Sequence, residues 1–256
     1  SKAIQSCAHV VELSQDATRL VSLAADFSTL QEESSISGDS VDLVTAGINM
    51  AKGNAAEALM IVANQLEKNG VPWPQLLPNA LRLFAADPHP AIRALLLRRM
   101  PYLQSHHPEL GWELFGLAMQ EKSPGLWPIA ESSLYHAYHQ KFEIVALWLA
   151  RLYREGSNED FETWGRISAL ASLSKRLEFS GLLAELNAGE TVEAWHGAAS
   201  VWTHSDNIQQ HREQCLAGLE AGLDAENHYA LAVARKFRNL FQETTPLVAV
   251  PIELIR

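Results

Sequence analysis

Residues 76–94 read Leu-Leu-Pro-Asn-Ala-Leu-Arg-Leu-Phe-Ala-Ala-Asp-Pro-His-Pro-Ala-Ile-Arg-Ala, which predicts two helices joined by a short break. The break begins at Asp87, whose carboxylate can cap the exposed N–H groups at the start of the second helix. Pro90 suits the first turn of that helix, because it lacks the N–H donor that this position would leave unpaired. Ile92 then enters the core one residue before Arg93. The stretch therefore predicts a helical hairpin.

The same alternation of helical segment and short break extends along most of the chain. Ala, Leu, Glu, Gln and Arg dominate long stretches, and 47% of the residues are apolar, so the chain can bury a large core. Gly and Pro fall between these stretches as helix stops, caps or first-turn residues. This pattern predicts an all-α protein, with breaks at residues 52–54, 69–72, 87–90, 105–108, 122–125, 156–158, 187–189, 204–207 and 224–227.

Three regions are expected along the chain. Residues 1–40 form an N-terminal helical segment, with apolar residues at helical spacing over 2–30 and a polar loop at 31–40. Residues 41–243 form about five helical hairpins, and residues 244–256 form a C-terminal tail. The chain starts at Ser1 without an initiator Met, and we expect it to be a piece of a longer protein.

The tryptophans give an independent indication of the repeat length. They fall into two series, each with steps of roughly 36 to 39 residues, which is the length of two helices and their turns. We expect the tryptophan-bearing sides of the helices to be buried against the next pair along the chain. The first series is Trp73, Trp112 and Trp148, and the second is Trp127, Trp164 and Trp202.

Four residues of the opening stretch carry a family resemblance. Asp87, Pro90, Ile92 and Arg93 match the Asp-x-x-Pro-x-(Val or Ile)-Arg string that opens the second helix of a HEAT repeat. The stretch therefore resembles a HEAT repeat, which implies a right-handed α-solenoid of HEAT-like helical hairpins. In such arrays the Asp and Arg of neighbouring repeats commonly pair, so the resemblance also implies that Arg93 supports the fold. The later units keep the rhythm of helices and lose this string.

A broader resemblance concerns residues 54–59, 90–99 and 193–199. Their texture is similar to the helical-repeat region that follows the nucleotide-binding module in bacterial STAND or NACHT-type signalling ATPases, several of which act in antiphage defence. The resemblance implies that the chain is a sensor or scaffold arm of such a protein.

Charge and cysteine content limit the kinds of partner. The formal net charge of -10 discourages binding to a polyphosphate backbone, so nucleic acid is an unlikely partner. Cys7 and Cys215 lie far apart without metal-ligand spacing, which favours a reducing cytoplasm. The longest apolar run, residues 58–63, is too short to span a membrane.

The sequence lacks the common catalytic motifs. No phosphate-binding loop, His-Glu-x-x-His, Gly-x-Ser-x-Gly or Cys-x-x-Cys is present, and no cofactor is expected. Residues 172–175 fit Ser-x-x-Lys and residues 205–207 fit Ser-Asp-Asn, but the Lys-Thr-Gly strand of penicillin-recognising enzymes is missing. His136, His139 and Glu143 would share one exposed helical face if the helix continued past Lys141, and they could then hold a metal ion.

The remaining candidates are residues for binding a partner. Arg93, Arg98 and Arg99 form a basic region suited to an acidic surface, although charge at a helix C-terminus more often offsets the helix dipole. Exposed aromatic residues would be anchors, because Trp, Tyr and Arg contribute most at interfaces. The candidate residues are Arg93, Arg98, Arg99, Trp112, Trp127, Tyr135, His136, Tyr138 and His139.

We therefore expect a non-catalytic protein-interaction module whose partner is another protein or a neighbouring domain of a longer chain. A second hypothesis is nucleic-acid binding, as in HEAT-like DNA glycosylases, which needs the three arginines, Lys175 and Arg176 to converge on one surface. A third is a metal-dependent enzyme that uses His136 and His139. The identity of the partner and the oligomeric state are not encoded in these patterns.

Overall fold

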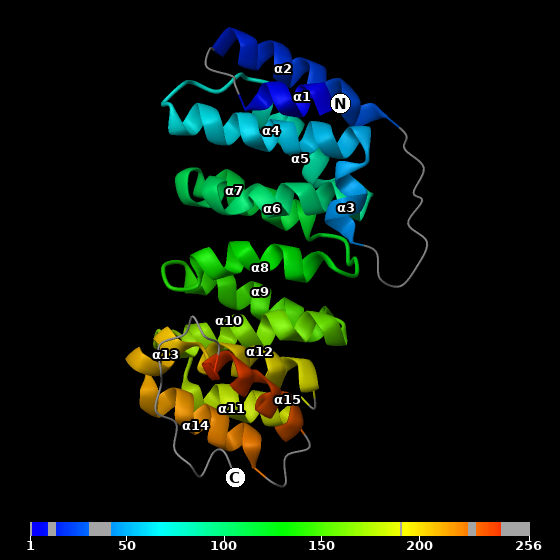
Figure 1. Cartoon of the computed structure of the whole chain (residues 1–256). Coiled ribbons are helices and arrows are strands. Elements are labelled where there is room, and N and C mark those ends of the chain that lie inside the picture. The colour runs from blue at the N-terminus through cyan, green and yellow to red at the C-terminus, as the bar shows by residue number, and fades with distance from the viewer. Residues whose placement is uncertain (1, 10–13, 31–41, 190, 225–228, 242–256) are drawn as a thin grey trace. The chain divides into compact units, whose positions relative to one another are not determined.

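The computed structural model describes residues 2–9, 14–30, 42–189, 191–224 and 229–241 (Figure 1). Every regular element in these ranges is a helix, and none of the described residues forms a strand, so the all-α prediction is confirmed. The same ranges contain no helix with both the length and the apolar character needed to cross a bilayer. The chain divides into two compact units, unit 1 over Ser1–Ser133 and unit 2 over Leu134–Arg256.

Unit 1 is built from helices that pack in alternation along the chain. Helix α4 packs against α6, and α5 packs against α7, while α1 and α2 both pack on α4. The N-terminal helices therefore belong to the same compact unit as the helices that follow them. The elements are α1 (Lys2–Ala8), α2 (Ser14–Asp26), η1 (Phe27–Thr29), α3 (Leu43–Ile48), α4 (Ala51–Lys68), α5 (Leu77–Ala85), α6 (Pro90–His106) and α7 (Pro108–Ala118), followed by α8 (Leu126–Ala137), in which the unit boundary falls.

The break between α5 and α6 forms where the sequence predicts it, but the residue that caps α6 is not the predicted one. Pro90 opens α6 as expected, but the capping residue is His89, whose side chain accepts the N–H of Ala91. The buried Asp87 accepts the N–H of His89 at 2.8 Å and forms an ion pair with Lys52 of α4 at 2.5 Å. The aspartate therefore joins the break to the neighbouring helix and does not cap α6 directly.

Two predicted breaks, residues 52–54 and 204–207, overlap the first turns of helices. The second overlaps α13 (Ser205–Gln210), and the chain breaks at Thr203 and His204 instead. Residues 52–54 lie inside the first turn of α4, and the break falls at Asn49 and Met50 instead. Gly53 lies within this helix, where a β-carbon would collide with the carbonyl oxygen of Gly47, so the glycine permits close packing of α3 and α4. The predicted loop at 31–40 and the predicted tail at 244–256 fall outside the described residues, as do residues 225–227 of the break predicted at 224–227.

Unit 2 continues with helices, and three of its breaks were not predicted: residues 138–141, residues 174–178 and His211. Helix α10 packs closely on α12, and α12 packs on α14 and α15. After the end of α8, the elements are α9 (Phe142–Glu155), η2 (Asn158–Asp160), α10 (Phe161–Leu173), α11 (Phe179–Ala188), α12 (Val192–Trp202), α13 (Ser205–Gln210), α14 (Arg212–Leu223), α15 (Ala230–Lys236) and η3 (Phe237–Phe241).

Two glycines set the distance between α10 and α12. A β-carbon at Gly165 would overlap the carbonyl oxygen of Ala194, and one at Gly197 would overlap that of Glu162. The backbones of the two helices therefore touch, which only glycine allows at these positions. This close crossing brings residues from both helices to one surface of unit 2.

The two tryptophan series have different environments. Trp127, Trp164 and Trp202 are buried, on α8, α10 and α12 respectively. Trp73, Trp112 and Trp148 are only half-buried. The expected burial of the tryptophans is therefore found for the second series and only in part for the first.

Candidate functional site

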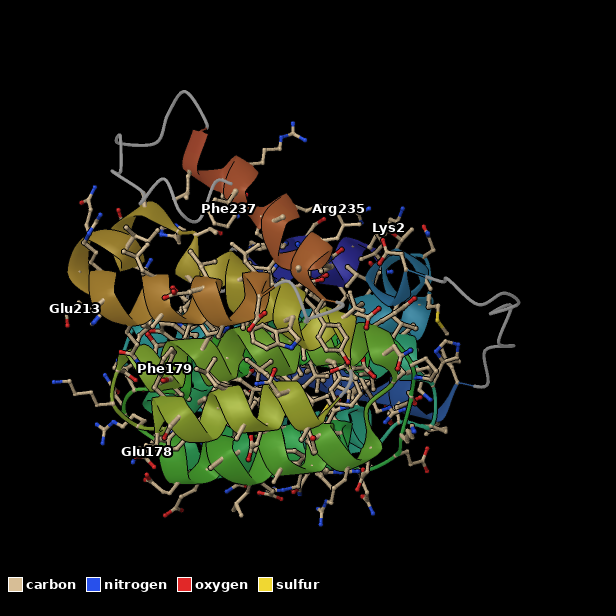
Figure 2. All side chains as sticks on the ribbon, turned by 90° about the horizontal axis from the view of Figure 1, so that it is seen from below. Lys2, Glu178, Phe179, Glu213, Arg235 and Phe237 are labelled. Atoms are coloured by element: carbon tan, nitrogen blue, oxygen red, sulfur yellow. The ribbon has the colours of Figure 1, made fainter. Side chains whose placement is uncertain are left out.

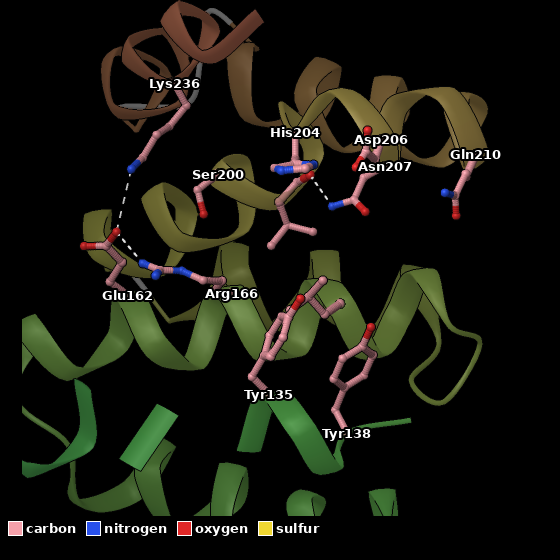
Figure 3. A pocket seen from close by; sticks show the side chains of 12 residues that line it. Tyr135, Tyr138, Glu162, Arg166, Ser200, His204, Asp206, Asn207, Gln210 and Lys236 are labelled. Carbon is pink, nitrogen blue, oxygen red and sulfur yellow. Dashed lines mark hydrogen bonds and ion pairs between the residues drawn. The ribbon is translucent and has the colours of Figure 1, made fainter. Parts of the chain in front are cut away.

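A pocket of about 630 Å³ opens on unit 2, and Figure 3 shows it from close by. Its walls come from the end of α8, from α10, from the corner between α12 and α13, and from the end of α15. We call it the polar pocket. Its lining residues are Tyr135, Tyr138, Glu162, Arg166, Leu170, Ser200, Val201, His204, Asp206, Asn207, Gln210 and Lys236.

Three basic side chains converge on one carboxylate oxygen at one end of the polar pocket. Glu162 lies in the first turn of α10, and Arg166 follows one turn later, so its guanidinium donates to Glu162 Oε1 at 2.6 Å. His196 Nδ1 of α12 lies 3.4 Å from the same oxygen, and Lys236 Nζ of α15 lies 3.7 Å from it. The helix crossing at Gly165 and Gly197 thus places these groups together.

The histidine in this group is held neutral. Desolvation by burial, followed by the charge of Lys236, lowers the pKa of His196 below its usual range, and the nearby Glu162 only partly opposes this. The permanent charges of the group are therefore those of Glu162, Arg166 and Lys236.

Two tyrosines form the opposite wall. The Tyr135 side chain is 49% exposed, and its ring centroid lies 6.0 Å from that of Tyr138. Burial, with a smaller contribution from Tyr135, raises the pKa of the Tyr138 phenol, so this hydroxyl stays protonated and can donate a hydrogen bond. Figure 3 shows both hydroxyls pointing from Tyr135 of α8 and from Tyr138, just after α8, toward the polar side chains of α10 and α12.

The corner between α12 and α13 is fixed by its own polar side chains. Asn207 Nδ2 donates to the carbonyl of Val201 at 2.9 Å, which leaves its Oδ1 as an acceptor toward the pocket (Figure 3). Ser200 Oγ donates to the carbonyl of Gly197 at 2.6 Å, within its own helix. This serine is therefore engaged with the backbone, and its geometry is not that of a nucleophile paired with a base.

A second hollow of unit 2 is mainly apolar and has a volume of about 490 Å³. We call it the apolar groove. Leu147 of α9 is 72% exposed there, and Tyr153 is 37% exposed while its ring packs near Trp164 at a centroid distance of 5.2 Å. The lining residues are Phe142, Ala146, Leu147, Leu149, Ala150, Tyr153, Arg154, Trp164, Ser168, Leu177 and Glu185, from α9, α10 and α11 and the segment before α11.

The two fragments that imitate penicillin-recognising enzymes line different pockets, and the first fragment lines a third pocket of unit 2. It is lined by Ser172, Lys175 and the N-terminal ends of α11 and α14, which Figure 2 marks with Glu178, Phe179 and Glu213. Ser172 Oγ accepts a hydrogen bond from Gln214 at 2.9 Å. Asp206 and Asn207 of the second fragment line the polar pocket instead. The two fragments therefore do not meet in one site.

The predicted basic region of unit 1 consists mainly of structural residues. Arg93 is only 2% exposed and donates to the carbonyls of Ala118 and Glu121 and to Ser123 Oγ, at 2.9, 3.1 and 2.6 Å. Burial lowers the pKa of its guanidinium, and the nearby acidic groups oppose that shift.

Arg99 is also engaged. It pairs with Glu57, whose side chain is 3% exposed, at 2.9 Å. Only Arg98 of the three arginines is exposed. Arg93 is therefore unsuitable as a partner contact, and Arg99 is already bound to a carboxylate within the unit.

The predicted aromatic and histidine candidates divide into two groups. Tyr135 and Tyr138 line the polar pocket, and His136 and His139 are exposed beside them without lining it. Trp127 is buried at 6% exposure, and Trp112 is half-buried, with its ring 5.3 Å from that of Phe115. The structure therefore brings together two of the nine predicted residues, Tyr135 and Tyr138, in one pocket.

The proposed metal face is not formed. Helix α8 ends at Ala137 and α9 begins at Phe142, so Glu143 does not share a helix with His136. Within the described ranges, no group of three or more His, Cys, Asp or Glu residues could hold a metal ion.

Sequence reasoning missed the acidic and basic residues of the polar pocket. The spacing of Glu162 and Arg166 was an available signal, because residues four apart share a helical face. Lys236 lies far along the chain and gave no such signal. Comparison with protein-family models, with curated proteins and with solved structures found no match for this chain.

Proposed function

We propose that this chain is a non-catalytic protein-interaction module, and that a partner binds in the apolar groove. The observation that carries this proposal is the exposure of Leu147, at 72%, in a hollow lined mainly by apolar side chains. Burying an exposed leucine contributes about 1.5–3 kcal/mol, and a large exposed apolar surface in a concave site is typical of interfaces. Tyr153 adds an aromatic anchor of the kind enriched at interface centres.

The groove fits the apolar face of an amphipathic helix. Its apolar residues lie between α9 and α11, with α10 beneath, and such a groove accepts side chains spaced by three and four residues along a partner helix. Arg154 and Glu185 also line it and carry opposite charges. We propose that the partner helix places an acidic residue near Arg154 and a basic residue near Glu185.

The same proposal includes the architecture, a right-handed α-solenoid of HEAT-like hairpins. It is supported by the alternate packing of α4 with α6 and α5 with α7 in unit 1, and of α10 with α12 in unit 2. Stacked hairpins place each helix against the corresponding helix of the next pair. The match of Asp87, Pro90, Ile92 and Arg93 to the HEAT string is a second support.

The membership of a larger signalling or defence ATPase is a further part of the proposal, and it rests on the resemblance of residues 54–59, 90–99 and 193–199. It predicts that the complete reading frame encodes a phosphate-binding loop upstream of Ser1. A complete reading frame without such a loop would exclude it.

Site-specific photo-cross-linking tests the groove. A benzophenone amino acid replaces Leu147 in the full-length protein in its native cells, and Leu231 is the matched control, because it is 65% exposed in the same unit and lies outside the groove. We expect position 147 to cross-link to one partner segment with apolar residues at helical spacing. Equal labelling from both positions, or labelling from neither, would contradict the proposal.

Substitution of the same two residues provides a second test of the apolar groove. Leu147→Glu is expected to abolish capture of the partner that position 147 identifies, whereas Leu231→Glu retains it. Both changes are on exposed side chains, so thermal unfolding should differ little from that of the unchanged protein and serves as the control for folding.

A further inference from the structure

The polar pocket is lined by the ammonium group of Lys236, whose hydrogen-bond donors are not all taken by neighbouring side chains. Lys236 Nζ lies 3.7 Å from Glu162 Oε1, which is too long for a hydrogen bond, while Arg166 already donates to that oxygen at 2.6 Å. An ammonium carries three donors. The side chain of Lys236 is 19% exposed and lines the pocket, so a ligand can reach it.

The charges of this end of the pocket favour an anion. Among the residues described in the group, two permanent cations, Arg166 and Lys236, face the single carboxylate of Glu162. A ligand carboxylate next to Lys236 would add the second negative charge. Arginine and lysine both form charge-assisted hydrogen bonds with carboxylates, and these are stronger than neutral ones.

The rest of the lining offers hydrogen bonds suited to a peptide chain. Asn207 Oδ1 is an acceptor for a main-chain N–H, and Gln210 can both donate and accept. The rings of Tyr135 and Tyr138 provide a flat wall, and the Tyr138 hydroxyl is a donor. Figure 3 shows these groups following one another from Lys236 and Arg166 to Gln210.

We propose that the polar pocket binds an extended, acidic segment of a partner protein, with an Asp or Glu carboxylate held by Lys236 and the main chain held by Asn207 and Gln210. This inference deepens the proposed interaction function by assigning the chemistry of a second contact, and it does not depend on the apolar groove.

Two features distinguish this ligand from a polyphosphate. Glu162 and Asp206 both line the pocket, so a chain of phosphates would meet two carboxylates, whereas a single carboxylate can be placed at the Lys236 end. The formal net charge of -10 also opposes a polyanion. It matters less for one carboxylate, because charges more than about 8 Å away are largely screened at physiological ionic strength.

An NMR titration tests the inference with a matched pair of probes. The probes are two capped hexapeptides of Gly and Ser, one with a single central Glu residue and the other with a Gln residue in its place. Each is titrated at millimolar concentration into the ¹⁵N-labelled chain. We expect the Glu peptide to shift the amides of Glu162, Ser200, His204 and Lys236, and the Gln peptide to bind about 5-fold more weakly.

Three variants assign the effect to the ammonium. Lys236→Met keeps an unbranched apolar stem, and we expect it to weaken the Glu peptide about 5-fold without changing the Gln peptide. Lys236→Arg keeps the positive charge and is expected to retain binding. Lys141→Met is the control, because Lys141 is exposed in the same unit and does not line the pocket. Unchanged amide shifts away from the pocket verify the fold.

The outcomes separate this inference from the proposed function. Equal binding of the two peptides, or no effect of Lys236→Met, would overturn the acidic specificity. Absence of shifts at the pocket with both peptides would overturn the pocket as a peptide site. In either case the apolar groove is judged separately, by the cross-linking at position 147.

Discussion

The charged groups of units 1 and 2 lie in different surroundings. In unit 1 several buried charges join helices: Lys52 pairs with Asp87, Glu57 pairs with Arg99, and Arg93 binds backbone carbonyls at and after the end of α7. In unit 2 the charged group around Glu162 lies at the wall of an open pocket.

The interior of unit 2 instead contains large aromatic rings and glycines. Trp195 and Trp202 are both fully buried, with ring centroids 6.3 Å apart, and the glycines allow α10 and α12 to touch. The comparison indicates that the buried ion pairs and hydrogen bonds of unit 1 hold its helices together. In unit 2, Lys236 lines an open pocket, where a ligand can reach its ammonium group.

The largest expected effect is at the contact of α10 and α12. Gly165→Ala would force a β-carbon against the Ala194 carbonyl, which is backbone and cannot rotate away. We expect a loss of about 3 kcal/mol or more in the free energy of unfolding, at the upper end for overpacking. Urea denaturation followed by circular dichroism measures it.

Gly181→Ala is the matched control for that change. Gly181 also lies in a helix of unit 2, but it is exposed, and a β-carbon there would come no nearer than 4.0 Å to Glu178 Cβ. Alanine should stabilise this helix by about 0.5–1 kcal/mol. If both variants lost the same stability, the close crossing would not be the reason.

The next effect tests the buried charge of unit 1. Arg93→Met removes the guanidinium and its hydrogen bonds to two carbonyls and to Ser123 Oγ, but retains much of the apolar stem. We expect the free energy of unfolding to fall by about 2–3 kcal/mol, because buried carbonyls lose a charged donor. Arg98→Met, at an exposed position of the same helix, should change it by less than about 0.5 kcal/mol. Equal losses in denaturant titrations would contradict a structural role specific to Arg93.

The smallest expected effect is a dependence of unit 2 on pH. The pKa of His196 is lowered in the folded state, so the unfolded chain binds the proton more readily. Stability from this group is therefore complete above the ordinary histidine pKa of about 6.5, and it is lost as the pH falls toward the folded-state value. Urea midpoints measured between pH 5 and 7 should decline less in His196→Gln. An unchanged decline would mean that other groups cause it.

The sequence predicted the helices better than the places where they end. The break at Asp87 to Pro90 was predictable because aspartate and proline have strong local preferences. Gly53 was misleading, since a glycine is usually a helix stop, whereas this one permits a close contact with Gly47. Local rules cannot distinguish these two uses of glycine, because the second depends on a neighbour in space.

The candidate site shows the same limit. Aromatic density around Tyr135 and Tyr138 pointed to a possible contact surface, and both tyrosines line the polar pocket. Arg93 was a candidate on charge alone, but it is buried. Lys236 was missed because Glu162, which lies close to it in space, is far away in the sequence, and nothing in the spacing of the two residues links them.

The helical character of this chain and the position of the strongest break between its helices follow from local sequence, because helix propensity, capping and proline placement act over a few residues. Which charged side chains pair in the interior and which line a pocket follows only from the packing of the helices. That division depends on burial and on distances between helices, and such distances are set where Gly165 and Gly197 let two backbones meet.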